Sequence, residues 1–392
     1  MGNSISNYSN YSLSDKVSLI ASTKTWIEGG AIQQLQHAAN MQGMQRVVGL
    51  PDLHPGRGYP IGAAFLTREV IYPALIGGDI GCGMRLCMTD LVARKHSADR
   101  LQKRLGNIDG ALADESAYWH EQIADSGFLD TGFADALGTI GGGNHFAEIQ
   151  VIDQVMDVKR CAALGLDTNY LCLLVHSGSR GFGGDILRQH IERFQHHGLP
   201  ADSEDAAHYF EQHQRALAYA ELNRSLIQER MLERLHASGR VILDIHHNFM
   251  QKVSDGEDTF YLHRKGAAPA DRGPIVIPGS RGDYSFLVEP ASTEASVGMH
   301  LSLLSLAHGA GRKWQRSECH GRLANRFTQD QLRRTRFGSH VVCADKHLLY
   351  EEAPEAYKPI DSVIEVLCEA GLIRVLARLK PVLSYKTAGG CC

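Results

Sequence analysis

The feature that most constrains this chain is a glycine-framed stretch from Ile76 to Arg85, which reads Ile-Gly-Gly-Asp-Ile-Gly-Cys-Gly-Met-Arg. Glycine has no Cβ and tolerates positive φ, so the backbone can fold tightly enough to aim the Asp79 carboxylate and the Cys82 thiol at one point. A hard oxygen and a soft sulfur together suit a borderline divalent cation such as Mn²⁺ or Zn²⁺ better than Mg²⁺. The same residues also fit a glycine turn between strands with a buried thiol.

Length and composition indicate a globular protein. The chain has 392 residues, 43% hydrophobic and 21% charged, which is enough for one large core or two domains. It has no apolar run of about 18 residues, as a membrane span requires, and its polar start lacks the features of a secretory signal. Seven of the nine cysteines are scattered, Cys391 and Cys392 are adjacent, and no Cys-x-x-Cys pair exists, which fits a reducing compartment. We therefore expect a cytoplasmic protein with no membrane segment.

The charge balance argues against a strongly basic coat for nucleic acid, because the net charge is −4. A local basic groove remains compatible with this balance. The chain has 20 histidines, and histidine is the commonest metal ligand and a common acid, base or nucleophile. The histidines that lie beside glycine are therefore the first candidates for chemistry.

Hydrophobic periodicity predicts a mixture of helices and strands without internal repeats or linkers. We expect one α+β domain spanning 1–392 with helical insertions at about 101–128 and 202–238, although a division into two domains near Arg240 also fits. Helices are predicted at 12–40, 202–238 and 361–370, and strands at 47–53, 61–65, 70–76, 171–175, 241–245, 275–277 and 372–384.

A second glycine-rich stretch, Leu137 to Glu148, leads Asn144, His145 and Glu148 into a short strand. In an extended segment Asn144 and Glu148 share one face and His145 lies on the other, unless a bulge turns it. The spacing alone therefore does not place all three side chains in one pocket.

Three further histidines follow strands or stand between glycines. His176 opens the loop His-Ser-Gly-Ser-Arg, where it fits a ligand beside an anion site or a core histidine bonded to the backbone. His247 belongs to the His-His-Asn sequence after another strand. His308 lies in Ala-His-Gly-Ala-Gly-Arg, and a nucleophilic imidazole needs such open surroundings. The loop Pro278-Gly279-Ser280 offers backbone N–H groups and a hydroxyl to an anion, which is a weak signal of a phosphate cradle. The basic run from Arg312 to Arg336 fits either an RNA surface or a solvated helix face.

Together, in order along the chain, these motifs resemble those of the RtcB-type RNA-splicing ligases. The resemblance runs from about Trp26 to Lys386 and rests on six short motifs: 78–83, 143–146, 176–180, 247–248, 263–267 and 308–312. It implies an α+β fold with stacked β-sheets and flanking helices around a deep cleft that holds two Mn²⁺ ions. Matching motif by motif, the implied metal ligands are Asp79, Cys82, His145, His176 and His247, with Cys82 bridging the ions.

The resemblance also implies the remaining site residues. His308 matches the catalytic residue that becomes guanylylated. The implied GTP- or GMP-binding residues are Asn144, His145, Phe146, Ala147, Glu148, His247, Asn248, Pro278, Gly279, Ser280, Arg281, Ser285, His308, Gly309, Ala310, Gly311 and Lys386. The candidates for binding RNA or its phosphates are Arg180, Arg264, Lys265 and Arg312.

A family member of this kind is expected to join an RNA 3′-phosphate or 2′,3′-cyclic phosphate end to a 5′-hydroxyl end, with GTP as co-substrate and a histidine–GMP intermediate. Two departures from the commoner pattern, at 313–318 and at Thr387, resemble a compact bacterial subgroup coupled to a peptide release factor homologue, which points toward RNA repair. Two alternatives are a metal-dependent phosphoesterase that opens cyclic phosphates without joining ends, and a non-catalytic module that binds RNA ends or the ribosome.

Overall fold

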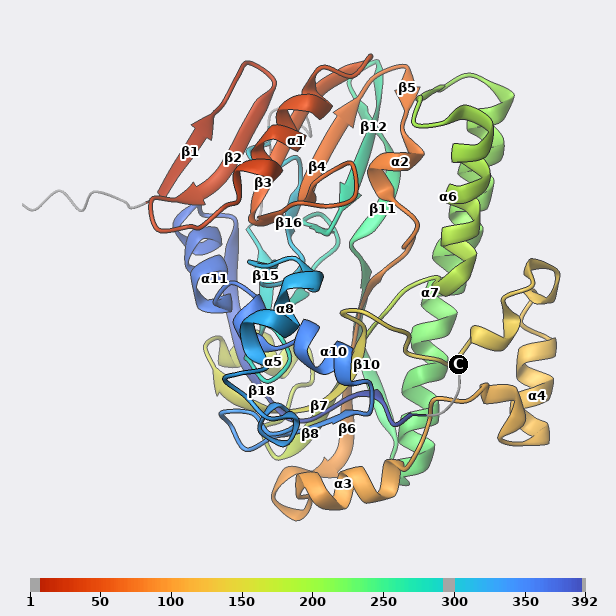
Figure 1. Ribbon diagram of the computed structural model, residues 1–392, viewed down its shortest axis with the longest axis vertical. Coiled ribbons are helices and arrows are strands. Elements are labelled where there is room, and N and C mark those ends of the chain that lie inside the picture. Colours follow the sequence, from red (N-terminus) through yellow and green to blue (C-terminus); the bar gives the residue numbers. More distant parts are fainter. Residues whose placement is uncertain (1–7, 292–299, 390–392) are drawn as a thin grey trace, which may run out of the picture.

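The computed structural model of the chain describes residues 8–291 and 300–389. Within them, two β-sheets form the centre of the fold (Figure 1). One has six strands in the order β1 (Tyr8–Ser12), β2 (Val17–Ser22), β3 (Met44–His54), β4 (Ile61–Thr67), β12 (Asp258–Lys265) and β11 (Asn248–Asp255). The other has eight: β10 (Gly239–His246), β6 (Gly83–Val92), β8 (Tyr170–Ser177), β7 (Phe146–Val155), β18 (Ile373–Thr387), β15 (Ser285–Pro290) and β14 (Ile275–Pro278) in that order, with β17 (His340–Cys343) beside β18.

The two sheets pack against each other through a shared apolar core. Val48 and Leu50 of β3 belong to the same buried cluster as Ile277 of β14 and Phe286 of β15. Each side chain of this kind that is fully removed from water contributes about 1.5–3 kcal/mol. Helix α11 (Ile360–Glu369) adds its apolar face to this cluster. The prediction of an α+β fold with stacked sheets is confirmed.

Helices cover the outer faces of both sheets. On the six-stranded sheet, Leu35 of α1 (Gly29–Ala39) packs with Phe65 of β4. On the eight-stranded sheet, Ile227 and Met231 of the 32-residue helix α7 (Glu204–Leu235) pack with Leu173 of β8. Figure 1 shows α6 (Arg180–Phe194) and α7 along one side of the molecule. No helix within the described ranges combines the length and apolarity needed to cross a membrane.

The remaining elements are short. The segment 101–128, predicted as helical, contains the end of α3 (Ala98–Leu105) and α4 (Ala117–Ala124). The other helices are α2 (Pro73–Ile76), α5 (Val158–Ala163), α8 (Arg316–Leu323), α9 (Gln329–Leu332) and α10 (Lys346–Glu351). Two small two-stranded sheets pair β5 (Val70–Ile71) with β9 (Leu199–Pro200), and β13 (Ala267–Pro269) with β16 (Ser305–Ala307).

Two of the predicted elements are wrong. Instead of one helix over 12–40, the structure has the end of β1, then β2, and a helix only over Gly29–Ala39. Residues 17–21 form an apolar run buried on both faces, which periodicity does not distinguish from a helix. The strand predicted over 70–76 ends at Ile71, because Pro73 has a fixed φ and begins the short helix α2.

Candidate metal centre and histidine site

The pairing of four neighbouring strands brings the sequence motifs to one sheet edge. Strands β10, β6, β8 and β7 lie side by side and antiparallel. Gly83, at the start of β6, pairs with Ser177 at the end of β8 and with His246 at the end of β10. Phe146, at the start of β7, pairs with His176. The residues that flank these ends therefore meet, although they lie far apart in the sequence.

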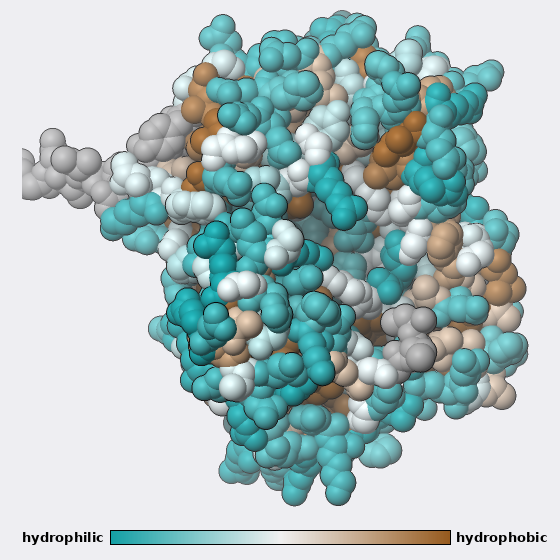
Figure 2. All heavy atoms as spheres, in the orientation of Figure 1, coloured by the Kyte–Doolittle hydropathy of each residue, from teal (hydrophilic) through white to brown (hydrophobic). Residues whose placement is uncertain are grey.

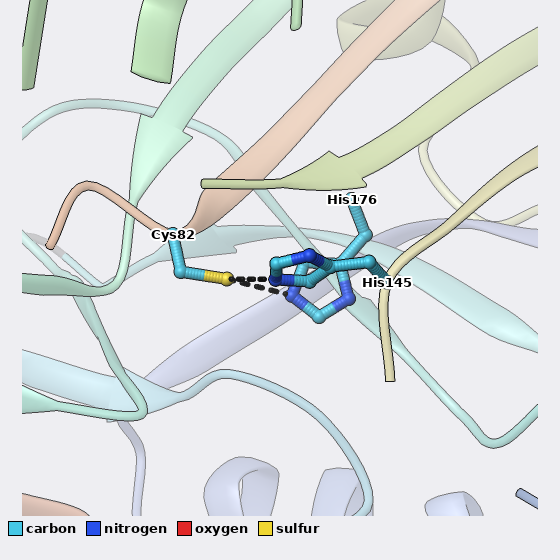
Figure 3. Close-up of side chains that lie close together, drawn as sticks. All are labelled: Cys82, His145 and His176. Atoms are coloured by element: carbon cyan, nitrogen blue, oxygen red, sulfur yellow. Dashed lines mark hydrogen bonds between the residues drawn. The ribbon is translucent and has the colours of Figure 1, made fainter. Parts of the chain in front are cut away.

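Cys82, His145 and His176 form a buried cluster at this edge, shown in Figure 3. The Cys82 sulfur lies 3.1 Å from Nε2 of His176 and 3.3 Å from Nε2 of His145. Asp79 Oδ2 lies 3.1 Å from the same nitrogen of His145. The donor atoms of Cys82, His145 and His176 all lie within 4.8 Å of one another. One thiol, two imidazoles and a carboxylate that converge in this way have the chemistry of a site for a borderline divalent cation.

Two glycines allow these loops to approach so closely. A Cβ on Gly178 would lie 2.3 Å from Asp79 Oδ1 and 3.1 Å from the Cys82 Cα atom. Gly81 has a φ of +73°, and a Cβ there would lie 2.7 Å from the Cβ of Ala220 on α7. Any larger residue at position 178 would displace the carboxylate, so the glycines of the motifs are steric requirements of the site.

The site continues from the cluster to His247 and His308. The ring centroid of His247 lies 5.1 Å from that of His176 and 4.8 Å from that of His308. His308 follows β16, and β13 pairs with this strand through Ala267, whose backbone N–H donates to the His247 carbonyl. The structure thus brings His308 beside the metal-ligand candidates.

Asp52 orients His308. Its Oδ2 accepts a hydrogen bond from Nδ1 of His308 at 2.6 Å and another from the His308 backbone N–H at 3.2 Å. Asp52 is fully buried in β3, and Lys358 donates to the carbonyls of its neighbours Pro51 and Leu53. Since a carboxylate accepts hydrogen bonds, Nδ1 carries a proton, and in the neutral ring the lone pair then lies on Nε2.

Burial sets the protonation states of the ligand candidates. It lowers the pKa of His176 and of His247 well below the ordinary value, so both rings are neutral. It raises the pKa of the Cys82 thiol well above the ordinary value, an effect that the Asp79 carboxylate increases. Burial acts to raise the pKa of Asp79, but the charge and hydrogen bond of His145, the hydrogen bond of Cys82 and the charge of Arg180 together outweigh it, and the net shift is downward. Neutral imidazoles and an ionised carboxylate are the forms that bind metal ions.

A cleft of about 1100 Å³ opens over this edge. The molecular face in Figure 2 is mostly hydrophilic and is hollowed near its centre. The predicted site residues that line the cleft are Asp79, Cys82, Asn144, Phe146, His176, His247, Asn248, Lys265, Pro278, Gly279, Ser280, Arg281, His308, Gly309, Ala310, Gly311, Arg312 and Lys386. Most of the predicted nucleotide-binding residues therefore face one cavity.

Four predicted nucleotide-binding residues do not line the cleft. His145 belongs to the buried cluster, and Ala147, Glu148 and Ser285 are buried in strands of the eight-stranded sheet. The Glu148 carboxylate accepts hydrogen bonds from the Ser384 hydroxyl and, at 2.7 Å, from Gln150 Nε2. The same amide nitrogen of Gln150 lies 2.9 Å from the Ser285 hydroxyl. Burial raises the pKa of Glu148 to about 7.

The four predicted phosphate-binding cations have different environments. Lys265 lines the cleft beside Gly77, and burial lowers its pKa to about 8. Arg312 also lines the cleft, where its guanidinium donates to the Glu352 carboxylate and to backbone carbonyls. Arg180 and Arg264 do not line it: Arg180 lies against Gly141, and Arg264 is fully buried.

The basic run from Arg312 to Arg336 divides between the cleft and the outer surface. Lys313 and Arg316 line the cleft, and Arg316 also lies 3.5 Å from the Glu352 carboxylate. On α8 and beyond, Arg322 pairs with Glu318 and Arg333 with Asp330 on the surface. The outer part of this run is thus a solvated face, while the RNA-surface reading stays a prediction for the part that lines the cleft.

Sequence reasoning missed Asp52 as a site residue. Asp52 lies 256 positions before His308, and only the folded chain shows that the two side chains meet. The one available signal was a carboxylate inside an otherwise apolar predicted strand, since a buried charge needs a partner.

Comparison with known proteins gives the family. The model of the family described as tRNA-splicing ligase RtcB matches residues 34–117 and 121–387. The chain is 54% identical over 378 residues to RNA-splicing ligase RtcB2 of Escherichia coli, covering 96% of this chain and 97% of that protein. It is 31% identical to tRNA-splicing ligase RtcB of Nanoarchaeum equitans, with 88% of each chain covered, and 30% identical to RNA-splicing ligase RtcB of Escherichia coli K12, with 93% and 97% covered. The chain therefore belongs to the RtcB family of RNA ligases, as its motifs predicted.

Proposed function

We propose that this protein is a GTP-dependent RNA ligase that joins an RNA 3′-phosphate or 2′,3′-cyclic phosphate end to a 5′-hydroxyl end. The observation that carries the proposal is the placement of His308. Its ring lies 4.8 Å from that of His247, at the edge of the Cys82 cluster, and Asp52 holds its Nδ1. An oriented, neutral imidazole beside a cation site is the arrangement that a histidine nucleophile requires.

The residues at the sheet edge fit two Mn²⁺ ions. Asp79, Cys82, His145, His176 and His247 supply oxygen, sulfur and nitrogen donors within one buried region, and the buried Nδ1 of His145 lacks a hydrogen-bond partner among the described residues. We assign these five residues as the ligands. When bound, the ions would lower the pKa of the Cys82 thiol and neutralise charge on phosphate oxygens.

His308 is the proposed nucleophile. Its Nε2 attacks the α-phosphorus of GTP, a P–N bond forms, and the bond to the β-phosphate oxygen breaks so that pyrophosphate leaves. Asp52 holds the Nδ1 proton and stabilises the positive charge that the ring gains in this step. An oxygen of the RNA 3′-phosphate then attacks the same phosphorus and breaks the P–N bond. The 5′-hydroxyl oxygen of the second RNA finally attacks the 3′-phosphate and releases GMP.

The cleft residues supply binding and orientation for the nucleotide. Asn144, the loop 278–281, the loop 309–311 and Lys386 surround the cavity, while the Glu148 network lies behind it. Lys265, Arg281 and Lys386 place positive charge on its wall, which favours phosphate groups.

The test is a ligation assay with one RNA ending in a 3′-phosphate and another beginning with a 5′-hydroxyl, in the presence and absence of GTP and Mn²⁺. We expect joined RNA only when both are present. Release of inorganic phosphate or opening of a cyclic phosphate without GTP, and without joined product, would instead identify a phosphoesterase. RNA binding with no reaction would identify a non-catalytic module.

We further propose a role in RNA repair, which rests on the departures from the commoner family pattern at 313–318 and at Thr387. A peptide release factor homologue remains the predicted partner, and the cytoplasm the predicted location. Comparing joining rates on nicked ribosomal RNA and on tRNA halves tests the role. A clear preference for tRNA halves would contradict repair.

A further inference from the structure

Helix α7 carries two adjacent polar residues, Asn223 and Arg224, whose side chains are fully buried. We propose that these two are positioning residues that hold the three loops bearing the metal ligands in register and thereby set the affinity of the site for divalent cations. The proposal rests on the metal site of the proposed function. It gives a positioning role to α7, which contributes none of the five proposed ligands.

Arg224 joins two of the ligand loops through a single nitrogen. Its Nη1 donates to the carbonyl of Gly81 at 2.7 Å and to the carbonyl of Ser177 at 3.1 Å. Gly81 lies between Asp79 and Cys82, and Ser177 follows His176 directly. The guanidinium therefore fixes the distance between the loop of the thiol and the loop of one imidazole.

The guanidinium itself is held by a buried ion pair. Arg224 Nε donates to Asp244 Oδ1 at 2.7 Å, and the other oxygen of Asp244 accepts from Arg85 at 2.8 Å. Arg224 Nη2 also lies 3.2 Å from Nδ1 of His246, which precedes the ligand His247. The planar fork of arginine makes all these contacts at once, which a lysine ammonium on a flexible stem does not.

Asn223 connects the loop that leads to His145 with the loop that follows His176. Its Oδ1 accepts from the backbone N–H of Gly138 at 2.9 Å, in the loop that leads to His145. Its Nδ2 lies 3.0 Å from the Ser177 hydroxyl and 3.1 Å from the Gly178 carbonyl, with a longer contact of 3.3 Å to the Thr139 carbonyl. One amide group thus contacts two of the three segments that supply imidazoles.

The close packing of α7 on Gly81 makes this clamp possible. Because a Cβ on Gly81 would lie 2.7 Å from the Cβ of Ala220, one turn before Arg224, only glycine lets the helix approach so closely. The carbonyls that Asn223 and Arg224 bind are buried and face no solvent that replaces the lost bonds. Without the two side chains, these hydrogen bonds from α7 no longer hold the ligand loops at fixed distances from one another. Partners behind metal ligands commonly change metal affinity by about 10- to 100-fold.

The experiment measures metal affinity rather than ligation. The chelator-treated wild-type protein and the variants Arg224→Met, Arg224→Lys and Asn223→Ala are titrated with Mn²⁺ by calorimetry. Each is also titrated with Co²⁺, whose thiolate charge-transfer absorption reports whether Cys82 joins the site. His213→Ala is the matched control, because His213 is an equally buried polar residue of α7 that accepts from the backbone N–H of Met250 instead of binding the ligand loops.

We expect Arg224→Met and Asn223→Ala to weaken Mn²⁺ binding by about 10- to 100-fold and to reduce the thiolate absorption. Arg224→Lys is expected to recover part of the affinity, and His213→Ala to keep the wild-type value even if its thermal stability falls. Wild-type affinity and absorption in both Arg224→Met and Asn223→Ala would overturn the proposal. If Arg224→Met does not fold, Asn223→Ala decides by the same criterion. Failure of the wild-type protein itself to bind Mn²⁺ would instead overturn the proposed function.

Discussion

At the scale of single residues, the chemistry depends on how His308 is held. Two hydrogen bonds to Asp52 Oδ2, from the ring and from the backbone of His308, fix both the position and the tautomer of the imidazole. Gly266 passes next to the ring, where a Cβ would lie 2.8 Å from Cε1 of His308. The ring is thus fixed on one side and open toward the cleft on the other.

The first prediction concerns Asp52. Asp52→Asn keeps the shape of the side chain but removes the negative charge that stabilises the positive charge gained by the His308 ring during GMP transfer. We expect the rate of GMP transfer to the protein to fall by at least about 10²-fold. The rate is measured with GTP labelled at the α-phosphate, with Asp345→Asn, on the surface, as the control. An unchanged rate in Asp52→Asn would show that His308 needs no orienting carboxylate.

The second prediction concerns Glu148 and pH. Its pKa is about 7 in the folded protein against 4.5 ordinarily, because burial disfavours the charge. Between these values the folded state binds more protons than the unfolded state, so stability falls as pH rises through this window. Glu148→Gln should remove this loss, which amounts to about 3 kcal/mol.

Urea unfolding of the metal-free protein at about pH 5 and about pH 7 measures the larger part of this loss, about 2 kcal/mol. The exposed Glu192, changed to Gln, is the control and should keep the wild-type pH dependence. Equal slopes for Glu148→Gln and the wild-type protein would contradict the assignment of the raised pKa.

At the scale of elements, the site is the joint edge of four antiparallel strands. The ends of β10, β6, β8 and β7 meet through the pairs Gly83–His246, Gly83–Ser177 and Phe146–His176. Any shift of one strand by a residue would move its ligand away from the others. The sheet register therefore sets the distances between the proposed ligands, which lie at or beside the strand ends.

The third prediction belongs to these loops. Gly178→Ala would place a Cβ 2.3 Å from Asp79 Oδ1, so the carboxylate must move. We expect Mn²⁺ affinity to fall at least about tenfold while the protein remains folded. Gly142→Ala, where a Cβ meets nothing within 4 Å, is the matched control. Calorimetric titration of both variants measures the effect, and equal affinities would contradict the steric role of Gly178.

The sequence predicted where the strands end, but it did not predict which strand ends meet. Apolar runs ending in glycine and histidine predicted the ends of β8 and β10, since such runs are typical of buried strands. They did not predict that β6 and β8 pair at Gly83 and Ser177, because register is a long-range property. The failure at 12–40 has another cause, because a short run buried on both faces has no periodicity that distinguishes a strand from a helix. Of the residues taken as one helical face, Leu35 is buried in α1 but Trp26 is 48% exposed before the helix begins.

At the scale of the whole molecule, the site joins parts of both sheets. Asp52 lies in the six-stranded sheet. Cys82 and His176 lie at the edge of the eight-stranded sheet, and His308 follows β16 of the small two-stranded sheet. The family resemblance predicted the ligand set, but the dependence of His308 on the other sheet is visible only in the fold.

The fourth prediction follows from this arrangement. Ions that bind only the folded state stabilise it, by about 2.7 kcal/mol when the free ion is at 100 times its dissociation constant. We expect Mn²⁺ to raise the melting temperature and a chelator to reverse the rise. Cys82→Ser should reduce the rise, while Cys368→Ser, at an exposed cysteine, should keep it. Scanning calorimetry measures the shift, and an equal rise in Cys82→Ser would contradict the role of the thiol.

The central claim is that His308 carries GMP during RNA joining, and covalent labelling with GTP labelled at the α-phosphate tests it most directly. We predict that the wild-type protein keeps the label through denaturing electrophoresis when Mn²⁺ is present, that His308→Ala carries none, and that His320→Ala, at an exposed histidine, is labelled like the wild-type protein. Label on His308→Ala, or a wild-type protein that joins RNA without becoming labelled, would contradict the account.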